Sequence, residues 1–261
     1  MTDDYARLRQ RRRFLLTAGG AGMTAAAGTR ALAQTADGRT PPSHWDTTVD
    51  VIVIGSGFAG CAAAAAAAEA GASVAVLEKM PAIGGNSAIN LGDYAAWDSS
   101  LHLRQKFKLG DDSAALHARD MLDAGDGYND PALVNALVNG APAALDWMIE
   151  RGGLKLRDVI HRQGLSNYRM HYGPSGRGID YIEALRRIAD AHRARFYFAH
   201  AVSRLWRRDA DGPVGGVEVK TPQGTQQWRA RRAVIIHALC AEARREKCAR
   251  HDGNLFATEC A

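Results

Sequence analysis

A continuous apolar run opens the part of the chain in which regular elements can be predicted. Residues 49–54 are mostly β-branched, which is typical of a strand buried on both faces of a parallel sheet. The glycine-rich segment 55–60 follows directly, and the alanine-rich segment 61–70 has high helix propensity. A second apolar run, 72–77, ends in Glu78. This order of strand, turn, helix and strand predicts an α/β fold with a Rossmann-like parallel sheet.

Helical periodicity marks the middle of the chain. Asn129 or Asp130 is the predicted N-cap of a helix that has Pro131 in its first turn. We expect Pro142 to interrupt this helix before a second one, which ends at Arg151. These elements would form a partial helical cap over the sheet domain.

A later helix and a set of short strands complete the predicted fold. Residues 180–183, Asp-Tyr-Ile-Glu, resemble a capping box and predict a helix start. Four helical side chains are assigned to the core: Leu133, Leu137, Leu185 and Ile188. After this helix the apolar period changes to that of strands. They form a predicted β-meander insertion and then a returning parallel strand, at 196–199, 202–206, 214–220, 226–231 and 233–236.

The net charge is unevenly distributed along the chain. The formal charge of +5 comes from 33 basic and 28 acidic residues among 261. Residues 1–33 hold six Arg and two Asp, which leaves 27 of the 33 basic and 26 of the 28 acidic residues for the remainder. A nearly neutral body without a basic stripe gives nucleic acid no electrostatic footprint, so no nucleic-acid partner is expected.

The basic N-terminal segment has the features of an export signal. The arginines at 11–13 precede Phe14-Leu15-Leu16, a weakly apolar stretch and the small-x-small sequence Ala31-Leu32-Ala33. It resembles a twin-arginine signal, with cleavage expected after Ala33 and a periplasmic location for the product. A membrane anchor and a retained basic tail are the alternatives, but the stretch is too short and glycine-rich to span a bilayer, so no stable membrane span is expected. Residues 34–48 are a predicted polar linker.

The first glycine-rich segment carries the strongest functional signal. Gly55 permits a tight turn, Gly57 lets the backbone approach a diphosphate, and Gly60 allows helix and strand to pack closely. The phosphates would lie on the N-terminal amides of the helix. Glu78, at the end of the second strand, would accept hydrogen bonds from ribose hydroxyls. The alternative is a glycine turn and an alanine helix that only pack together.

A second glycine-rich segment follows the acidic strand end. Gly84 and Gly85 allow another close backbone approach to phosphate, and Asn86 and Ser87 supply hydrogen-bonding side chains. An NAD-only Rossmann domain does not need this loop.

These motifs resemble the FAD-binding domain of the fumarate reductase and flavocytochrome c flavoprotein family. The resemblance rests on residues 50–60, on 78–79, on 83–87 and, more loosely, on the small residues around Gly92. It implies a glutathione-reductase-like fold with FAD as cofactor, its flavin near residues 86–92. It also implies that the backbone near Val202 lies beside the adenine.

The motifs and the resemblance together define a predicted cofactor site. Some relatives attach flavin covalently through a His near the double-glycine loop, but no His lies between Gly84 and Leu101, so noncovalent FAD is expected. The predicted cofactor-binding residues are Gly55, Ser56, Gly57, Phe58, Ala59, Gly60, Glu78, Lys79, Gly84, Gly85, Asn86, Ser87, Gly92 and Val202.

A candidate substrate-binding residue lies in the segment 168–178, which is rich in Gly, His and Arg. In the resembled family a comparable loop borders the active-site cleft, which makes His171 a candidate ligand for an anionic substrate. The alternative is an exposed polar loop. No metal site is predicted, because no metal-ligand spacing was found in the chain.

The resemblance also implies a reaction. Members of the family pass a hydride between flavin N5 and a C=C bond next to a carboxylate or ketone, while an arginine transfers a proton. By family position that arginine lies beyond Ile236, so no catalytic residue is assigned. No Cys-x-x-Cys-His haem motif occurs, which implies a separate electron donor. The alternatives are a non-catalytic FAD-binding remnant and an NAD-dependent Rossmann dehydrogenase.

The composition changes abruptly after the last predicted strand. The family continues with an Ala-Thr-Gly-Gly turn, whereas residues 237–261 form a polar tail rich in Arg and Glu that contains three of the four cysteines. We therefore interpret 49–236 as an incomplete FAD-binding domain, with activity impaired by truncation, and 237–261 as an aberrant tail. A frameshift or a truncated reading frame is our hypothesis for its origin.

Overall fold

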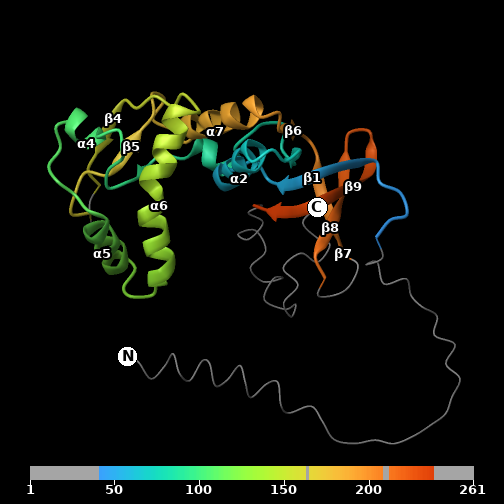
Figure 1. Ribbon diagram of the computed structural model, residues 1–261, viewed down its shortest axis with the longest axis horizontal. Coiled ribbons are helices and arrows are strands. Elements are labelled where there is room, and N and C mark those ends of the chain that lie inside the picture. Colours follow the sequence, from blue (N-terminus) through green and yellow to red (C-terminus); the bar gives the residue numbers. More distant parts are fainter. Residues whose placement is uncertain (1–40, 163–164, 208–211, 238–261) are drawn as a thin grey trace, which may run out of the picture. The chain divides into compact units, whose positions relative to one another are not determined.

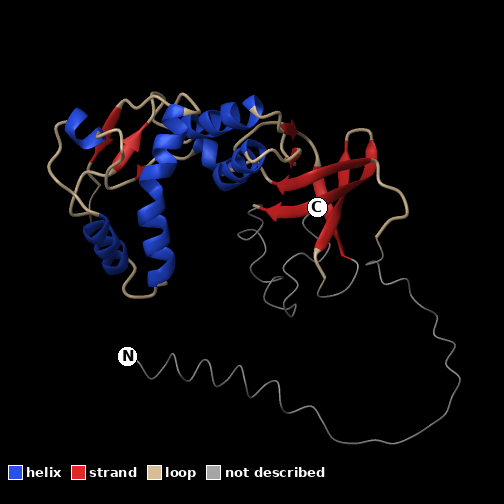
Figure 2. Ribbon diagram, in the orientation of Figure 1, coloured by secondary structure: helices blue, strands red, loops and turns tan. Residues whose placement is uncertain are grey.

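The computed structural model describes residues 41–162, 165–207 and 212–237 (Figure 1). The predicted signal peptide, residues 34–40 of the linker and all of the predicted tail except His237 lie outside the described residues. Helices and strands are interspersed along the chain up to a run of four final strands, which bears out the α/β fold class (Figure 2).

A six-stranded sheet forms the main body of the described region. Its strand order is β6-β2-β1-β9-β8-β7. The first four strands pair in parallel, whereas β8 pairs antiparallel with both β9 and β7. The strand bounds are β1 Thr47–Ile54, β2 Val74–Leu77, β6 Arg195–Tyr197, β7 Ala201–Arg207, β8 Val214–Thr221 and β9 Gly224–Ile236.

Two details of the predicted strand order are wrong. The segment expected as the first meander strand, 196–199, corresponds to β6, which pairs with β2 as a third parallel strand. The expected strands 226–231 and 233–236 are one continuous strand, β9. Arg231 and Arg232 lie within this strand, and Arg231 Nε pairs with Asp50 Oδ1 at 2.8 Å. A register shift between Val49 and Val51 of β1 accommodates the long strand.

The parallel strands are buried on both faces. Val51, Val53, Val74 and Val76 share one core cluster with the helices α2 (Phe58–Glu69) and α7 (Ile179–Ala191). Ile52, Ile54, Ala75 and Leu77 point the other way and pack against Val217, Val219 and Trp228 of the meander. This two-sided burial explains why residues 49–54 read as a nearly continuous apolar run, since side chains alternate between the faces of a strand.

Helices and a small sheet form the second part of the described region. The helices α3 (Gly85–Ile89), α4 (Leu103–Lys106), α5 (Ala114–Ala124) and α6 (Pro131–Glu150) lie between β2 and α7 in the chain. The strands β3 (Tyr94–Ala95), β4 (Asp158–Ile160) and β5 (Met170–Tyr172) pair in the order β3-β5-β4. Figure 1 shows α5 and α6 side by side, as their shared core cluster requires.

The predicted break at Pro142 does not occur. α6 runs through this residue for 20 residues, with Asp130 as its N-cap and Pro131 in its first turn as expected. Pro142 is buried within the helix. Packing of the helix thus outweighs the loss of one backbone donor, which is the local cost of an internal proline.

The predicted core of the helices is half correct. Leu185 and Ile188 of α7 are buried at 1% exposure each. Leu133 and Leu137 of α6 are exposed at 70% and 51%, and the buried positions are their neighbours Val134 and Val138 instead, which face α5. A helix rotated by one residue buries a different stripe, and both stripes here are apolar, so periodicity could not choose between them.

The predicted capping box at the start of α7 is also wrong. The helix begins at Ile179 with Gly178 as its N-cap, and no side chain caps it. Asp180 Oδ2 accepts hydrogen bonds from the amide and hydroxyl of Ser175, at 2.9 and 2.7 Å. The carboxylate therefore stabilises the preceding loop.

By length and composition α6 is apolar enough to cross a bilayer, and it is the one such helix among the described residues. Core helices of soluble proteins meet the same criteria. Val138, Leu145 and Met148 of α6 are almost fully buried within the domain, so the helix already has protein neighbours along much of one side.

A buried ionic network ties the helical part together. The guanidinium of Arg169 is fully buried and makes a bidentate contact with Asp112, at 2.6 and 2.8 Å. It also pairs with Asp120, which accepts from the amide and hydroxyl of Ser166 at 2.8 and 2.5 Å. Burial alone would raise the pKa of Asp120, but the hydrogen bonds from Arg169 and Ser166 prevail and lower the pKa to about 2.

The low pKa of Asp120 predicts acid sensitivity. A carboxylate whose pKa lies lower in the folded than in the unfolded chain stabilises the fold above its unfolded pKa, and this contribution disappears as the pH falls. We expect the urea midpoint to decrease as the pH falls from the ordinary aspartate pKa of 3.8 to the folded-state pKa of about 2. In an Asp120→Asn variant, the urea midpoint should depend less steeply on pH. If the urea midpoint of the variant depended on pH as that of the wild type does, other carboxylates would cause the acid sensitivity. Asp50 is one of them, because hydrogen bonds from Arg231 and Ser73 also lower its pKa.

Candidate dinucleotide-binding site

The turn between β1 and α2 requires glycine at two positions. Gly55 has φ +95°, a left-handed conformation that favours glycine. At Gly60, a Cβ atom would lie far inside van der Waals distance of the Gly55 carbonyl oxygen. The first turn of α2 therefore packs directly on the backbone of the preceding turn.

The N-terminus of α2 is open to a ligand. Its N-cap, Gly57, has no side chain to accept a hydrogen bond from the first turn. The Phe58 amide donates to Ser87 Oγ at 3.1 Å, whereas no described acceptor lies within hydrogen-bond distance of the amides of Ala59 and Gly60. Unpaired amides and the helix dipole together favour an anion at this position.

Glu78 lies at the end of β2, beside this turn. It is 7% exposed, and its Oε2 accepts from the amide and hydroxyl of Ser56 at 2.9 and 2.6 Å. Its Oε1 accepts from the Met80 amide at 2.9 Å. Because a carboxylate has about four acceptor positions, Oε1 retains capacity for one more donor, such as a ribose hydroxyl.

Ser56 joins the two glycine-rich segments. Its side chain is fully buried, and its Oγ also accepts from the amide of Gly84 at 3.0 Å. The sequence placed Ser56 among the cofactor ligands. The structure gives it a further role, in which it connects the carboxylate of Glu78 to the second loop. The sequence feature that could have indicated this role is the position of a hydroxyl side chain between Gly55 and Gly57.

The second glycine-rich segment forms a tight turn into α3. Gly84 has φ +97° and Gly85 φ +47°. Gly92 has φ +67° and lies against the backbone of Arg177, so that a Cβ atom would stand 2.6 Å from that carbonyl carbon. Lys79 and Asn86 are exposed. Contacts of these residues with a ligand stay predictions.

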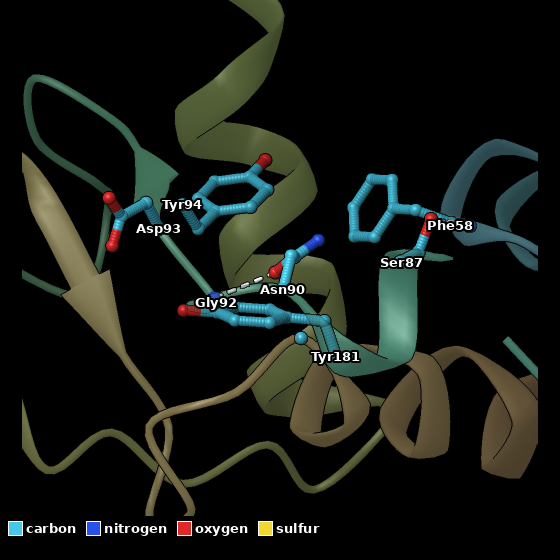
Figure 3. A pocket seen from close by; sticks show the side chains of 8 residues that line it. Phe58, Ser87, Asn90, Gly92, Asp93, Tyr94 and Tyr181 are labelled. Carbon is cyan, nitrogen blue, oxygen red and sulfur yellow. Dashed lines mark hydrogen bonds between the residues drawn. The ribbon is translucent and has the colours of Figure 1, made fainter. Parts of the chain in front are cut away.

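A pocket of about 210 Å³ opens beside α3 (Figure 3). Tyr94 and Tyr181 stack with ring centroids 5.5 Å apart, and Phe58 lies across the pocket from them. Sequence analysis missed these two tyrosines, because residues from β3 and α7 meet only in the folded chain. The full lining is Phe58, Ser87, Asn90, Gly92, Asp93, Tyr94, Gly178 and Tyr181.

Both tyrosine hydroxyls are occupied. Tyr94 donates to the carbonyl of Ala141 at 2.8 Å, and Tyr181 donates to the carbonyl of His171 at 2.5 Å. Burial raises the pKa of each phenol above its ordinary value. The two rings thus provide an apolar, uncharged wall.

His171 lies inside the protein. It belongs to β5 and is 1% exposed, with Nδ1 within 2.9 Å of the Arg169 carbonyl oxygen and 3.3 Å of that of Tyr94. Burial lowers its pKa and favours the neutral ring. The exposed-loop alternative therefore does not describe His171, and its role as a substrate ligand stays a prediction. Val202, the predicted adenine neighbour, lies in β7 and packs partly buried against the meander core.

The parallel sheet, the glycine turn at the N-terminus of α2 and the acidic residue at the end of β2 are the features of a dinucleotide-binding protein. Residues 50–260 match the model of the FAD binding domain family. The chain belongs to this family. FAD is accordingly its cofactor, which favours the flavin interpretation over the NAD-dependent alternative.

Curated relatives and solved structures agree with this assignment. A fumarate reductase (cytochrome) of Shewanella frigidimarina is 34% identical over 216 residues, which are 80% of this chain and 36% of the relative. The acrylate reductase flavoprotein subunit of Shewanella woodyi is 40% identical over 144 residues, or 54% of this chain and 27% of that subunit. The open form of a flavocytochrome c3 fumarate reductase superposes with a TM-score of 0.67 and 28% identity, over 74% of this chain and 34% of that one.

The chain therefore spans about a third of the length of these relatives. The residues that are present fit the ADP half of FAD. Gly57 has no side chain that would keep a ligand from the backbone, the Ala59 and Gly60 amides have no described acceptor, and Glu78 retains an acceptor for ribose.

Proposed function

We propose that this chain is the FAD-holding part of an exported reductase that acts on a C=C bond next to a carboxylate or ketone. The observation that carries the proposal is the bonded unit of Glu78, Ser56 and Gly84, which joins both glycine-rich segments beside the open end of α2. The names of relatives, fumarate reductase and acrylate reductase, support an unsaturated carboxylate as substrate. The arginine-rich N-terminal sequence supports export to the periplasm. The electrons for the reduction would come from a separate donor.

The roles of the chain's own residues follow from their positions. The α2 amides bind and orient the diphosphate, and Glu78 accepts from the adjoining ribose. Phe58, Tyr94 and Tyr181 line the pocket next to α3 and exclude water from it. Bound FAD supplies hydride transfer, a chemistry that no side chain can provide.

The pocket residues favour a second candidate function, a module that binds FAD without catalysis by itself. A proton donor must reach the substrate in a form that releases its proton. Both tyrosine hydroxyls of the pocket instead donate to backbone carbonyls and have raised pKa values. Reduction of an enoate by the purified chain with an artificial electron donor would support the first candidate, and FAD binding without such reduction would support the second.

Flavin content tests the cofactor assignment directly. The purified chain is expected to be yellow and to release FAD on denaturation. A Glu78→Gln variant should bind FAD at least 10-fold more weakly, because it loses a charge-assisted hydrogen bond to ribose. Glu183→Gln, which changes an exposed residue of α7, serves as the control and should bind normally. A colourless wild-type chain that fails to take up added FAD would contradict the proposal.

A further inference from the structure

His237 lies at the carboxyl end of β9, next to the first glycine-rich turn. Its amide donates to the carbonyl oxygen of Ile54 at 2.8 Å, so the pairing of β9 with β1 continues one residue beyond Ile236. Sequence analysis assigned this residue to the aberrant tail. The structure places it at the edge of the sheet where the diphosphate site begins.

The imidazole of His237 is directed at Gly57. A Cβ atom built on Gly57 would stand 3.1 Å from His237 Cε1 and 3.2 Å from its Nδ1. The same point lies 3.3 Å from Ser87 Oγ. The ring and the Ser87 hydroxyl thus lie beside Gly57, the second glycine of the motif, whose role is to let a diphosphate approach the backbone.

The donors around this position lack an acceptor. His237 Nδ1 is buried and has no hydrogen-bond partner among the described residues. Ser87 Oγ accepts from the Phe58 amide and keeps its own proton to donate. Buried polar atoms in proteins are almost always paired, so an unpaired nitrogen beside unpaired helix amides indicates an anionic ligand.

We propose that His237 holds the diphosphate of FAD by donating a hydrogen bond from Nδ1. This inference rests on the proposed function and adds one ligand to its site. A donor just beyond β9 completes a ring of donors whose other members come from α2 and α3. The carboxylate of Glu78 is not part of this ring, because an ionised carboxylate only accepts hydrogen bonds, here from Ser56 and Met80.

The test compares two replacements of His237 in the full chain. His237→Phe retains a ring and removes the donor, and His237→Asn retains an N–H group near the position of Nδ1. Titration of FAD, followed by quenching of flavin fluorescence, should show about 10-fold weaker binding for the Phe variant and a smaller loss for the Asn variant. His192→Phe, at the exposed end of α7, is the matched control and should bind as the wild type does.

Two further measurements locate the effect. ADP carries the same diphosphate without flavin, and its affinity should decrease by the same factor in His237→Phe. In ³¹P NMR spectra of the FAD complexes, the diphosphate signals of His237→Phe should shift from those of the wild type. Equal or tighter FAD binding by His237→Phe would overturn this inference, because the ring would then only occupy space. Failure of the wild-type chain to bind FAD would instead overturn the proposed function.

Discussion

Replacement of Gly60 with alanine is expected to abolish FAD binding. The new Cβ atom would overlap the carbonyl oxygen of Gly55, which is backbone and cannot rotate away. Either α2 or the turn must shift, and each shift moves the amides that face the diphosphate. We expect FAD affinity to decrease more than 100-fold. We also expect the free energy of unfolding to fall by about 1–3 kcal/mol, the usual cost of overpacking.

A second glycine-to-alanine change supplies the control. Gly140 lies inside α6, and a Cβ atom there would meet no other atom within 4 Å. Gly140→Ala should therefore leave FAD binding unchanged and stabilise the helix by about 0.5–1 kcal/mol. Normal FAD affinity of Gly60→Ala, measured by fluorescence quenching beside this control, would show that close packing of α2 on the turn is not needed for the site.

Replacement of Arg169 with methionine is expected to have the largest effect on stability. The guanidinium is fully buried between Asp112 and Asp120, and its removal leaves Asp120 without its cation and Asp112 with only Arg104, at 3.7 Å. Breaking a buried ion pair from one side costs about 3–5 kcal/mol. Urea unfolding followed by circular dichroism measures the loss.

Two comparisons make this expectation specific. Arg151→Met removes an arginine that is 67% exposed and pairs with Glu69 at 4.0 Å, and it should cost at most about 1 kcal/mol. At lower pH the free energies of unfolding of Arg169→Met and the wild type should differ less, because protonation neutralises the carboxylates that have lost Arg169. An equal difference in the free energy of unfolding at neutral and acidic pH would show that lost packing, rather than uncompensated charge, explains the destabilisation.

Local sequence was sufficient for the elements nearest the cofactor. The strand at 49–54, the glycine turn and the alanine helix appear as predicted, because each depends on residues that are adjacent in the chain. The glycines at 55 and 60 could be assigned roles from the motif alone. The same holds for Asp130 as the N-cap of α6, whose Oδ1 accepts from the Ala132 amide at 2.8 Å.

Predictions failed where distant packing decides the outcome. Pro142 signals a break, yet α6 continues because its buried side packs against other elements. Leu133 and Val134 are equally apolar, and only contact with α5 selects the valine for the core. The sequence predicts two strands where the structure has the single strand β9. Arg231 lies on this strand and pairs with Asp50, a residue 181 positions away in the chain, and local sequence does not show such a contact.

Sequence alone determined the class of this protein, since the turn, the acidic strand end and the second glycine pair are contiguous motifs whose chemistry follows from residue type. Only the tertiary structure decided what surrounds them. Ser56 bonds to Glu78 and Gly84, and His237 approaches Gly57 from the carboxyl end of β9. The physical reason is that parallel pairing of β1, β2 and β9 brings their carboxyl ends to one edge of the sheet. Residues that meet there are far apart in the chain, so their contact cannot be predicted from local sequence.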